Sequence, residues 1–326
     1  MADQFVRVRL NRIDGADLRL FEFDYDLTFA VFFLDADERV YARYGGRDVK
    51  GPDTRQSLDG LRYTMTSVLD MHARKDRLFA PHRDDGPRYI RDVAGARNRR
   101  GCYHCHQVRE VLDADLKRTG KWDREMAYRY PLPDNLGLFL DVDRGNVVER
   151  IAPDSPAAKA GLQKGDVVRQ LADVPIHSIA DAQFALDRGP KIGVLAVRWE
   201  RDGKASAGEL PLAVGWKKSP VYWRPSLIHL LPSLPLYGDD LTGAEKQVLG
   251  LAPKQMAFRQ KMTVPPRAAE AGVRGGDVIL GIDDRKLEGD AGTFTDYIRH
   301  EYLAGDRVTL NVVRDGKRVN LPLTLR

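Results

Sequence analysis

The chain is poor in the residues that hydrolases use as nucleophiles and that small secreted domains use as covalent cross-links. Its 326 residues include only two cysteines, so a disulfide-rich scaffold is excluded. No serine lies in a Gly-x-Ser-x-Gly motif or in another glycine-rich nucleophile loop, which argues against a serine hydrolase. No phosphate-binding loop or acid–base pair stands out, so a transferase is not expected either.

Long apolar runs and clustered charge are also missing. No stretch approaches the ~18 consecutive apolar residues of a membrane-spanning helix. The net charge of +5 is spread along the chain, and no basic stripe is interleaved with aromatic residues. We therefore expect no membrane span and no nucleic-acid partner. The first ten residues also lack the apolar core and the cleavage site of a signal peptide.

The two cysteines that are present form a Cys-x-x-Cys-His motif, which ends at His106. Two thiols at this spacing can add to the vinyl groups of a haem, and the adjacent imidazole can bind the iron. The motif predicts haem c bound at Cys102 and Cys105, with His106 as the proximal metal ligand. We favour Met126 as the sixth ligand, and its alternatives are Met71, His72 and His82.

Three other interpretations of the cysteine pair stay open. A redox dithiol is one, because His104 and the start of a helix would lower a thiol pKa. A zinc site from both cysteines and two histidines is the second, and a structural disulfide or inert pair is the third. Apolar positions at helical spacing after Cys105 predict a helix that begins there. A loop followed by such a helix resembles the haem-attachment segment of small cytochromes c.

An internal repeat occupies the second half of the chain. Three segments recur in the same order: Leu136-Gly137-Leu138 as Leu249-Gly250-Leu251, Pro156–Gly161 as Pro266–Gly272, and Gly165–Val168 as Gly276–Ile279. Each copy then ends in alternating strands joined by an Arg-Asp-Gly-Lys turn, at 201–204 and at 314–317. Glycine in such a turn takes the positive φ that a tight hairpin needs.

The repeated segments resemble the PDZ domains of bacterial periplasmic proteases, without the protease domain. The resemblance covers residues 132–215 and 247–326 and implies two partly open β-barrels. It also implies that Leu136, Gly137, Leu138 and Phe139 form a loop that binds the C-terminal carboxylate of a peptide, which adds as a strand. Protein or peptide C-termini are the implied partners. The alternative is that the two domains only space or dock other parts.

Residues 216–246 lie between the two copies. The part from Trp216 to Tyr237 is rich in proline and aromatic residues and holds a leucine-rich run. It is too apolar for a free linker, so we predict a stiff connector packed on its neighbours. A partner-docking groove is the alternative interpretation.

Residues 1–76 have a different pattern. Alternating or continuous apolar runs predict strands at Phe5–Leu10, Phe29–Leu34 and Arg39–Tyr44, and helical spacing predicts a helix from Leu58 to Met71. This order resembles the second half of a thioredoxin fold, without its Cys-x-x-Cys helix and its cis-proline. Residues 77–131 then hold a loop and the helical Cys-x-x-Cys-His segment.

Together these patterns predict an α+β multidomain chain, in which a partial thioredoxin-like unit precedes two PDZ domains. The predicted function is that of an extracytoplasmic, redox-associated adaptor that binds a protein partner and carries haem c for electron transfer. The alternative is a non-enzymatic PDZ scaffold with a redox-active or structural cysteine pair. A periplasmic location would require a targeting segment ahead of the first residue, and no oligomeric state is predicted.

Overall fold

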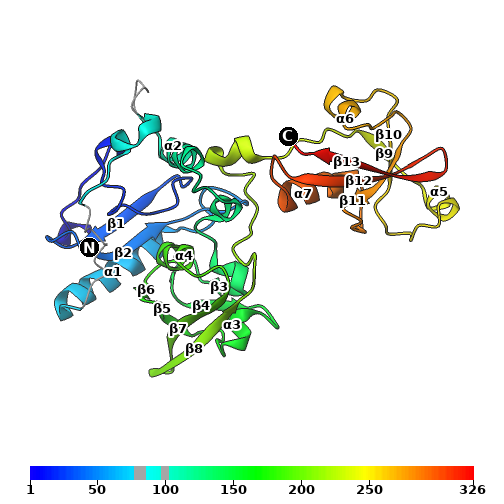
Figure 1. Ribbon diagram of the computed structural model, residues 1–326. Coiled ribbons are helices and arrows are strands. Elements are labelled where there is room, and N and C mark those ends of the chain that lie inside the picture. Colours follow the sequence, from blue (N-terminus) through cyan, green and yellow to red (C-terminus); the bar gives the residue numbers. More distant parts are fainter. Residues whose placement is uncertain (77–85, 97–102) are drawn as a thin grey trace. The chain divides into compact units, whose positions relative to one another are not determined.

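The computed structural model describes residues 1–76, 86–96 and 103–326, which divide into two compact units (Figure 1). Unit 1 is Met1–Ser219 with Trp223–Ser226, and unit 2 is Pro220–Tyr222 with Leu227–Arg326. Both combine helices with antiparallel sheets, so the predicted α+β multidomain class is confirmed. The described strands form open sheets and not closed barrels. None of the described helices has the length and apolar character to cross a membrane.

The N-terminal module, residues 1–76, is built on a hairpin and one helix. Strands β1 (Ala30–Leu34) and β2 (Val40–Gly45) pair antiparallel, and helix α1 (Leu58–Arg74) follows. The Ser57 hydroxyl caps α1 by accepting from the Gly60 N–H. Val68 and Met71 of α1 pack on the hairpin. The predicted strands at 29–34 and 39–44 and the predicted helix are therefore confirmed.

The predicted strand over Phe5–Leu10 is wrong. A short 3-10 helix (Ala2–Gln4) precedes these residues, and they pair with no strand in the described part of the chain. Val6 is 95% exposed and Val8 is 78% exposed. An alternating pattern becomes a strand only where a neighbouring strand takes up its hydrogen bonds. Of the elements predicted for residues 1–76, the described structure thus contains β1, β2 and α1, and the thioredoxin-like interpretation stays a prediction.

The helix predicted from Cys105 is present as α2 (Cys105–Arg118). Val108 and Val111 of α2 pack against residues near the N-terminus, among them Leu18 and Tyr25. Three 3-10 helices flank α2, and they are Ile90–Asp92, Ala94–Ala96 and Arg124–Tyr128. The segment that carries the cysteine motif therefore shares a core with the N-terminal module and has no separate core of its own.

The first predicted PDZ region completes unit 1. Its strands are β3 (Leu138–Leu140), β4 (Val148–Ile151), β5 (Val167–Leu171), β6 (Val174–Pro175), β7 (Gly193–Arg201) and β8 (Lys204–Leu212). Its helices are α3 (Pro156–Lys159) and α4 (Ile179–Asp187). β3 pairs with β4, and the other four strands form a sheet in the order β6-β5-β7-β8. The β7–β8 hairpin turns between Arg201 and Lys204, as predicted.

Unit 2 holds the second predicted PDZ region around one five-stranded sheet. Its strands are β9 (Gly238–Asp240), β10 (Phe258–Gln260), β11 (Val278–Ile282), β12 (Arg307–Arg314) and β13 (Lys317–Thr324), in the order β13-β12-β11-β10-β9. Its helices are α5 (Gly243–Val248), α6 (Pro266–Glu270) and α7 (Ala291–Glu301). Phe258 of β10 packs on Phe294 of α7 in its core.

The sheet of unit 2 begins earlier than the repeat in the sequence indicates. Its first strand is β9, whereas Leu249-Gly250-Leu251 follows α5 and lies between β9 and β10. In the first copy, Leu136-Gly137-Leu138 leads into β3. β3 pairs with β4, which precedes the short helix α3, and β9 pairs with β10, which precedes the short helix α6. β9 is therefore the structural counterpart of β3. The α5 insertion separates β9 from the segment that resembles the Leu-Gly-Leu loop.

Part of the proline-rich connector is a packed element of unit 1. The Trp216 ring packs against the core of the first PDZ region, and the Trp216 carbonyl accepts from Asn135. Arg224 is 3% exposed and donates to Asp24 at 2.6 Å. The Ser226 hydroxyl donates to the buried Asp26 at 2.7 Å. These buried contacts exclude a free linker over this stretch.

A buried junction fastens the N-terminal module to α4. The Arg43 N–H on the free edge of β2 donates to Asp181 at 2.8 Å, and the Ser178 hydroxyl donates to the Arg43 carbonyl. The Arg43 guanidinium lies 3.5 Å from the Phe184 ring centre and 3.7 Å from the Asp181 carboxylate. Burial raises the pKa of Asp181 to about 6 and lowers the pKa of Arg43. The first turn of α4 and its N-cap residue thus satisfy the main-chain groups of Arg43 that a neighbouring strand would otherwise satisfy.

Helix α1 and the residues before it extend this junction. Four side-chain hydrogen bonds cross it, and they are Arg55–Asp134, Ser57–Asp143, Tyr63–Asn146 and Ser67–His177. His177 accepts or donates through Nδ1 only, and its buried Nε2 has no partner among the described residues. Burial therefore lowers the pKa of His177 to about 4.

We expect His177 to make unit 1 sensitive to acid. Its pKa falls from 6.5 to about 4 on folding, so the unfolded chain binds the proton more tightly. The stabilisation is full above about pH 6.5 and is lost as the pH falls toward 4, by up to about 3 kcal/mol. His177→Gln removes this titration. Acidification should lower the free energy of unfolding of the wild type more than that of the variant, when both are measured in urea.

The contribution of Asp181 to the free energy of unfolding changes with pH in the opposite direction, because its raised pKa stabilises the folded state below about pH 6. That contribution is common to both proteins and cancels in the difference. The exposed His300 of unit 2 provides the control substitution, His300→Gln, which should leave the pH dependence of unit 1 unchanged. A difference between wild type and His177→Gln that stays constant from pH 7 to pH 4.5 would contradict the expectation.

Candidate functional site

The predicted carboxylate-binding loop is a 3-10 helix (Pro133–Leu136) that ends at Gly137 and leads into β3. The Gly137 N–H donates to the Asp134 carbonyl at 2.9 Å, and the Gly137 carbonyl accepts from Ala152 at 2.9 Å. Leu136 and Leu138 are buried in the core, and Phe139 is partly exposed. The four predicted residues are therefore together, but the central amide is already bonded inside the loop.

Gly137 is required for local structure. Its φ of 72° lies in the left-handed region, which residues with a Cβ avoid. A Cβ at this position would overlap the side chain of Ser155, the N-cap of α3. Glycine thus permits both the turn and the close approach of α3, independently of any ligand.

The outer edge of β9 in unit 2 has no partner strand. The Tyr237 carbonyl accepts from Lys261, and the Leu241 N–H donates to Ala257. Because bonded pairs alternate in an antiparallel ladder, Gly238 and Asp240 direct their N–H and C=O groups to the other side. β9 is the last strand of its sheet, so within the described residues these groups face no strand.

The helices beside the two counterpart strands differ in exposure. Helix α7 begins next to β9, since the Ala291 N–H donates to Asp240 at 2.9 Å, and only Phe294 and Ile298 of α7 are buried. Every residue of α4 except Ala180 and Asp187 is buried. The chain itself covers α4, through the β2 junction and through a hydrogen bond from Gln183 to Tyr130. Helix α7 is therefore more accessible than α4, whereas β3 and β9 are both end strands of their sheets among the described residues.

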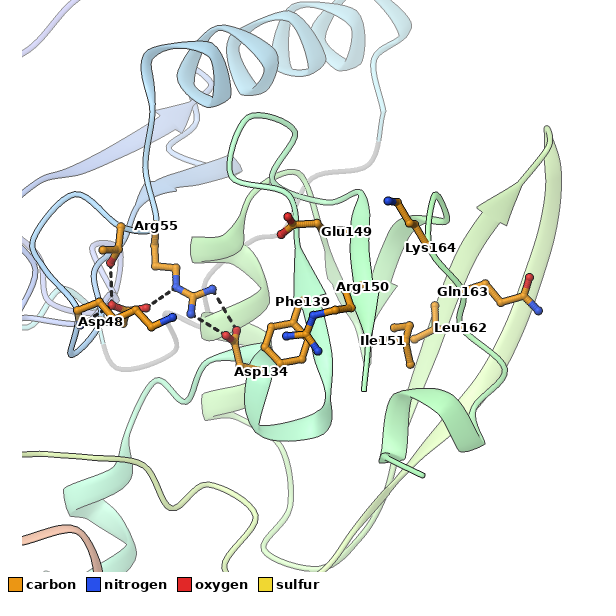
Figure 2. Close-up of a pocket in the computed structure, with 12 residues that line it drawn as sticks. Asp48, Arg55, Asp134, Phe139, Glu149, Arg150, Ile151, Leu162, Gln163 and Lys164 are labelled. Atoms are coloured by element: carbon orange, nitrogen blue, oxygen red, sulfur yellow. Dashed lines mark hydrogen bonds and ion pairs between the residues drawn. The ribbon is translucent and has the colours of Figure 1, made fainter. Parts of the chain in front are cut away.

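A pocket of about 900 Å³ lies in unit 1 between the Asp48–Arg55 loop and the outward face of β3 and β4 (Figure 2). Arg55 forms its closed end, where it donates to both Asp48 and Asp134 (dashed lines in Figure 2). The Arg150 guanidinium lies over the Phe139 ring. Of the residues that line this pocket, only Phe139 is a binding residue predicted from the sequence.

The cysteine motif is only partly visible, because Cys102 lies outside the described residues. Cys105 is the first residue of α2 and packs against the apolar cluster around Tyr25 and Val108. Burial raises the pKa of the Cys105 thiol. A raised pKa keeps the thiol protonated at neutral pH, which argues against a reactive dithiol.

The predicted iron ligands differ in their surroundings. His106 Nδ1 lies 2.9 Å from Glu110, and the Met126 carbonyl accepts from Arg109, one helical turn after His106. Met71 is buried in the hairpin core, His72 hydrogen-bonds to Tyr41, and His82 lies outside the described residues. In the ranges that the structure describes, no three His, Cys, Asp or Glu side chains are grouped to hold a metal, and the zinc alternative also involves Cys102, which lies outside them.

Sequence reasoning missed β9 and the Arg43 junction. Leu249-Gly250-Leu251 matches the Leu-Gly-Leu segment of the first copy in sequence. The strand that pairs with β10 is β9, which lies ahead of α5 and carries no repeated motif. Arg43 and Asp181 carry no local signal, because each looks like an ordinary surface charge in the sequence.

We expect Gly137→Ala to destabilise unit 1 by about 3 kcal/mol, from the left-handed φ together with the overlap on Ser155. Gly203→Ala is the matched control, because Gly203 has a similar φ of 75° with open space around its Cβ position. The control should lose about 1 kcal/mol. Both values come from chemical denaturation, and equal losses would mean that the contact with Ser155 contributes nothing.

Comparison with known proteins agrees with the architecture of the C-terminal two-thirds. Residues 147–201 match the PDZ domain family, and residues 262–325 match it a second time. The periplasmic serine endoprotease DegP of Escherichia coli (strain K12) is 29% identical over 151 residues, which cover 46% of this chain and 29% of DegP. A Staphylococcus aureus (strain N315) protein named as a zinc metalloprotease is 35% identical over 119 residues, 31% of this chain and 28% of that protein.

Among solved structures, the HtrA-type protease AlgW with a decapeptide matches at 18% identity and a TM-score of 0.25, covering 50% of each chain. This chain spans less than a third of the length of the curated relatives. Since both family matches fall on the β-sheet regions described above, this chain contains two PDZ domains.

Proposed function

We propose that this chain is a protein-binding adaptor in which the second PDZ domain takes an extended peptide at β9. The unpaired edge at Gly238–Asp240, beside the exposed helix α7, carries the proposal. A peptide that adds as a strand gains main-chain hydrogen bonds from such an edge, and neighbouring side chains then supply specificity. PDZ domains bind peptides in this way, so the geometry and the family agree.

In this proposal the first PDZ domain has a structural role. Its helix α4 is occupied by the N-terminal module through Arg43. For Leu136 to Phe139 to receive a carboxylate, the Gly137 amide would first have to release the Asp134 carbonyl. The first domain thus holds the N-terminal module in place, and the second domain meets the partner.

The proposed setting is extracytoplasmic. The similarity to DegP supports it, because that protein is named as periplasmic. No protease activity is proposed, since the similarity covers less than a third of DegP. The thioredoxin-like interpretation of residues 1–76 remains a hypothesis based on the order β1, β2 and α1.

Asp240 offers a direct test of the β9 edge. Asp240→Pro removes one outward N–H donor and leaves the β9–β10 ladder, to which Asp239 and Leu241 contribute. Asp240→Asn is the control, because it keeps the N–H and an oxygen for Ala291. Peptides with free C-termini, selected by display on the full chain, would be measured by calorimetry. We expect at least about tenfold weaker binding for the proline variant and little change for the control.

Two results would reject the assignment to β9. Selection could enrich no peptide, or the selected peptide could bind Asp240→Pro as tightly as the wild type. Thermal unfolding of both variants shows whether unit 2 is intact, which separates a lost edge from a lost fold.

Covalent haem c at Cys102 and Cys105 is a second candidate function. The hydrogen bond between Glu110 and His106 Nδ1 supports it, because a carboxylate on one ring nitrogen leaves the lone pair of the other for a metal. The segment of Met126 returns to α2 close to His106, as a sixth ligand would need. Bound haem would supply one-electron transfer. The alternative, a structural cysteine pair, is supported by the raised pKa of Cys105.

Expression with the haem-attachment machinery tests this candidate. Covalent haem would give a Soret band that survives denaturation, and it should fall sharply in Cys102→Ser and Cys105→Ser. His104→Ala is the control, because His104 fills a variable position between the two cysteines of the motif and is exposed. Absence of the band from the wild type would leave the adaptor function without a redox group.

A further inference from the structure

The pocket in Figure 2 is a separate feature from the β9 edge and belongs entirely to unit 1. Its volume of about 900 Å³ falls in the range of ligand sites, ~300–1,000 Å³. One wall is the Asp48–Arg55 loop of the N-terminal module, and the other walls are β3, β4 and the turn at Leu162–Lys164. It exists because the module is fixed against the first PDZ domain.

The closed end of the pocket is preorganised. The Arg55 side chain is 13% exposed and donates to Asp48 at 2.8 Å and to Asp134 at 2.6 Å. Both carboxylates are therefore already paired, and Asp48 also accepts from Thr54. This triad holds the loop in position and offers no free charge to a ligand.

The rim of the pocket has an excess of positive charge. Lys50, Arg150 and Lys164 are exposed, and none has a carboxylate partner within the described ranges. Glu149 is the one rim carboxylate without a cation partner in the same ranges. The Arg150 guanidinium stacks 3.5 Å from the centre of the Phe139 ring, which leaves the N–H groups on its edge free for carboxylates. A ligand with two or more negative charges would complete this rim.

The floor between these cations is apolar. Phe139, Ile151 and Leu162 line it, and together they offer a contact surface for an aliphatic side chain. A phosphate group could also pair with these cations, but it would leave the apolar floor without a contact. Carboxylates that flank an apolar residue match both the rim and the floor.

From this combination we propose that the pocket binds an acidic peptide segment, in which aspartate or glutamate flanks an aliphatic residue. Lys50, Arg150 and Lys164 contact its carboxylates, and Phe139, Ile151 and Leu162 contact its apolar side chain. This site is independent of the proposed peptide edge at β9, so each can be correct without the other.

The probe is a fluorescein-labelled peptide of alternating glutamate and leucine residues, and a lysine–leucine peptide of equal length is its counterpart. Fluorescence anisotropy with the full chain gives the affinity at low and at physiological salt. We expect the acidic peptide to bind and the basic one not to bind. The double substitution Lys50→Glu with Lys164→Glu should weaken binding at least about tenfold, more than salt screening does.

Lys121→Glu with Lys204→Glu is the matched control, because it makes the same change in net charge at exposed lysines that do not line the pocket. Arg150→Gln keeps a planar group over Phe139 without the charge, and it should weaken binding severalfold with an unchanged melting temperature. Asp240→Pro should have no effect, which separates this site from β9.

Three results would overturn the proposal. Equal losses in the two double variants would mean that only overall charge attracts the peptide. Binding of the basic peptide with equal affinity would mean that the cations select nothing. Full displacement of the acidic peptide by inorganic phosphate at equal concentration would mean a general anion site instead of a peptide site.

Discussion

The contact between Arg43 and the capped start of α4 determines what the rest of unit 1 can do. Ser178 and Asp181 satisfy the free edge of β2, so a hairpin that would be marginal alone becomes part of a PDZ domain. The same contact covers part of α4. It also brings the Asp48–Arg55 loop over β3 and β4, which creates a pocket that neither part has by itself.

A buried ion pair is an expensive way to join two parts of a chain, because both charges lose their hydration. Here the cost is offset by several weaker contacts, including the Phe184 ring beneath the guanidinium and the main-chain bonds to Arg43. We infer that this pair fixes the position of the module more than it adds to stability, since any other position would separate Arg43 from Asp181. In the proposed function the two PDZ domains therefore have different roles, one as an internal support and one as the domain that meets a partner.

Local patterns in the sequence were enough for the elements whose contacts are local. Helical spacing located α1 and α2, and the Arg-Asp-Gly-Lys turns located the β7–β8 and β12–β13 hairpins. The pattern at Phe5–Leu10 misled, because strand pairing depends on a neighbour that no local pattern specifies. At the candidate sites, the spacing of Cys102, Cys105 and His106 predicts haem attachment, and this stays a prediction. The β9 edge depended on an insertion and on pairing with β10, which spacing alone does not reveal.

An open strand edge is also a hazard, since two copies of one protein can join through it. Asp239 and Asp240 occupy most of β9, and the side chain of Asp239 is 83% exposed. If two β9 edges paired, each face of the joined sheet would carry aspartates from both copies, and the repulsion between these like charges would oppose the pairing. The two aspartates of β9 would thus disfavour self-association through this edge more than pairing with a neutral or basic strand.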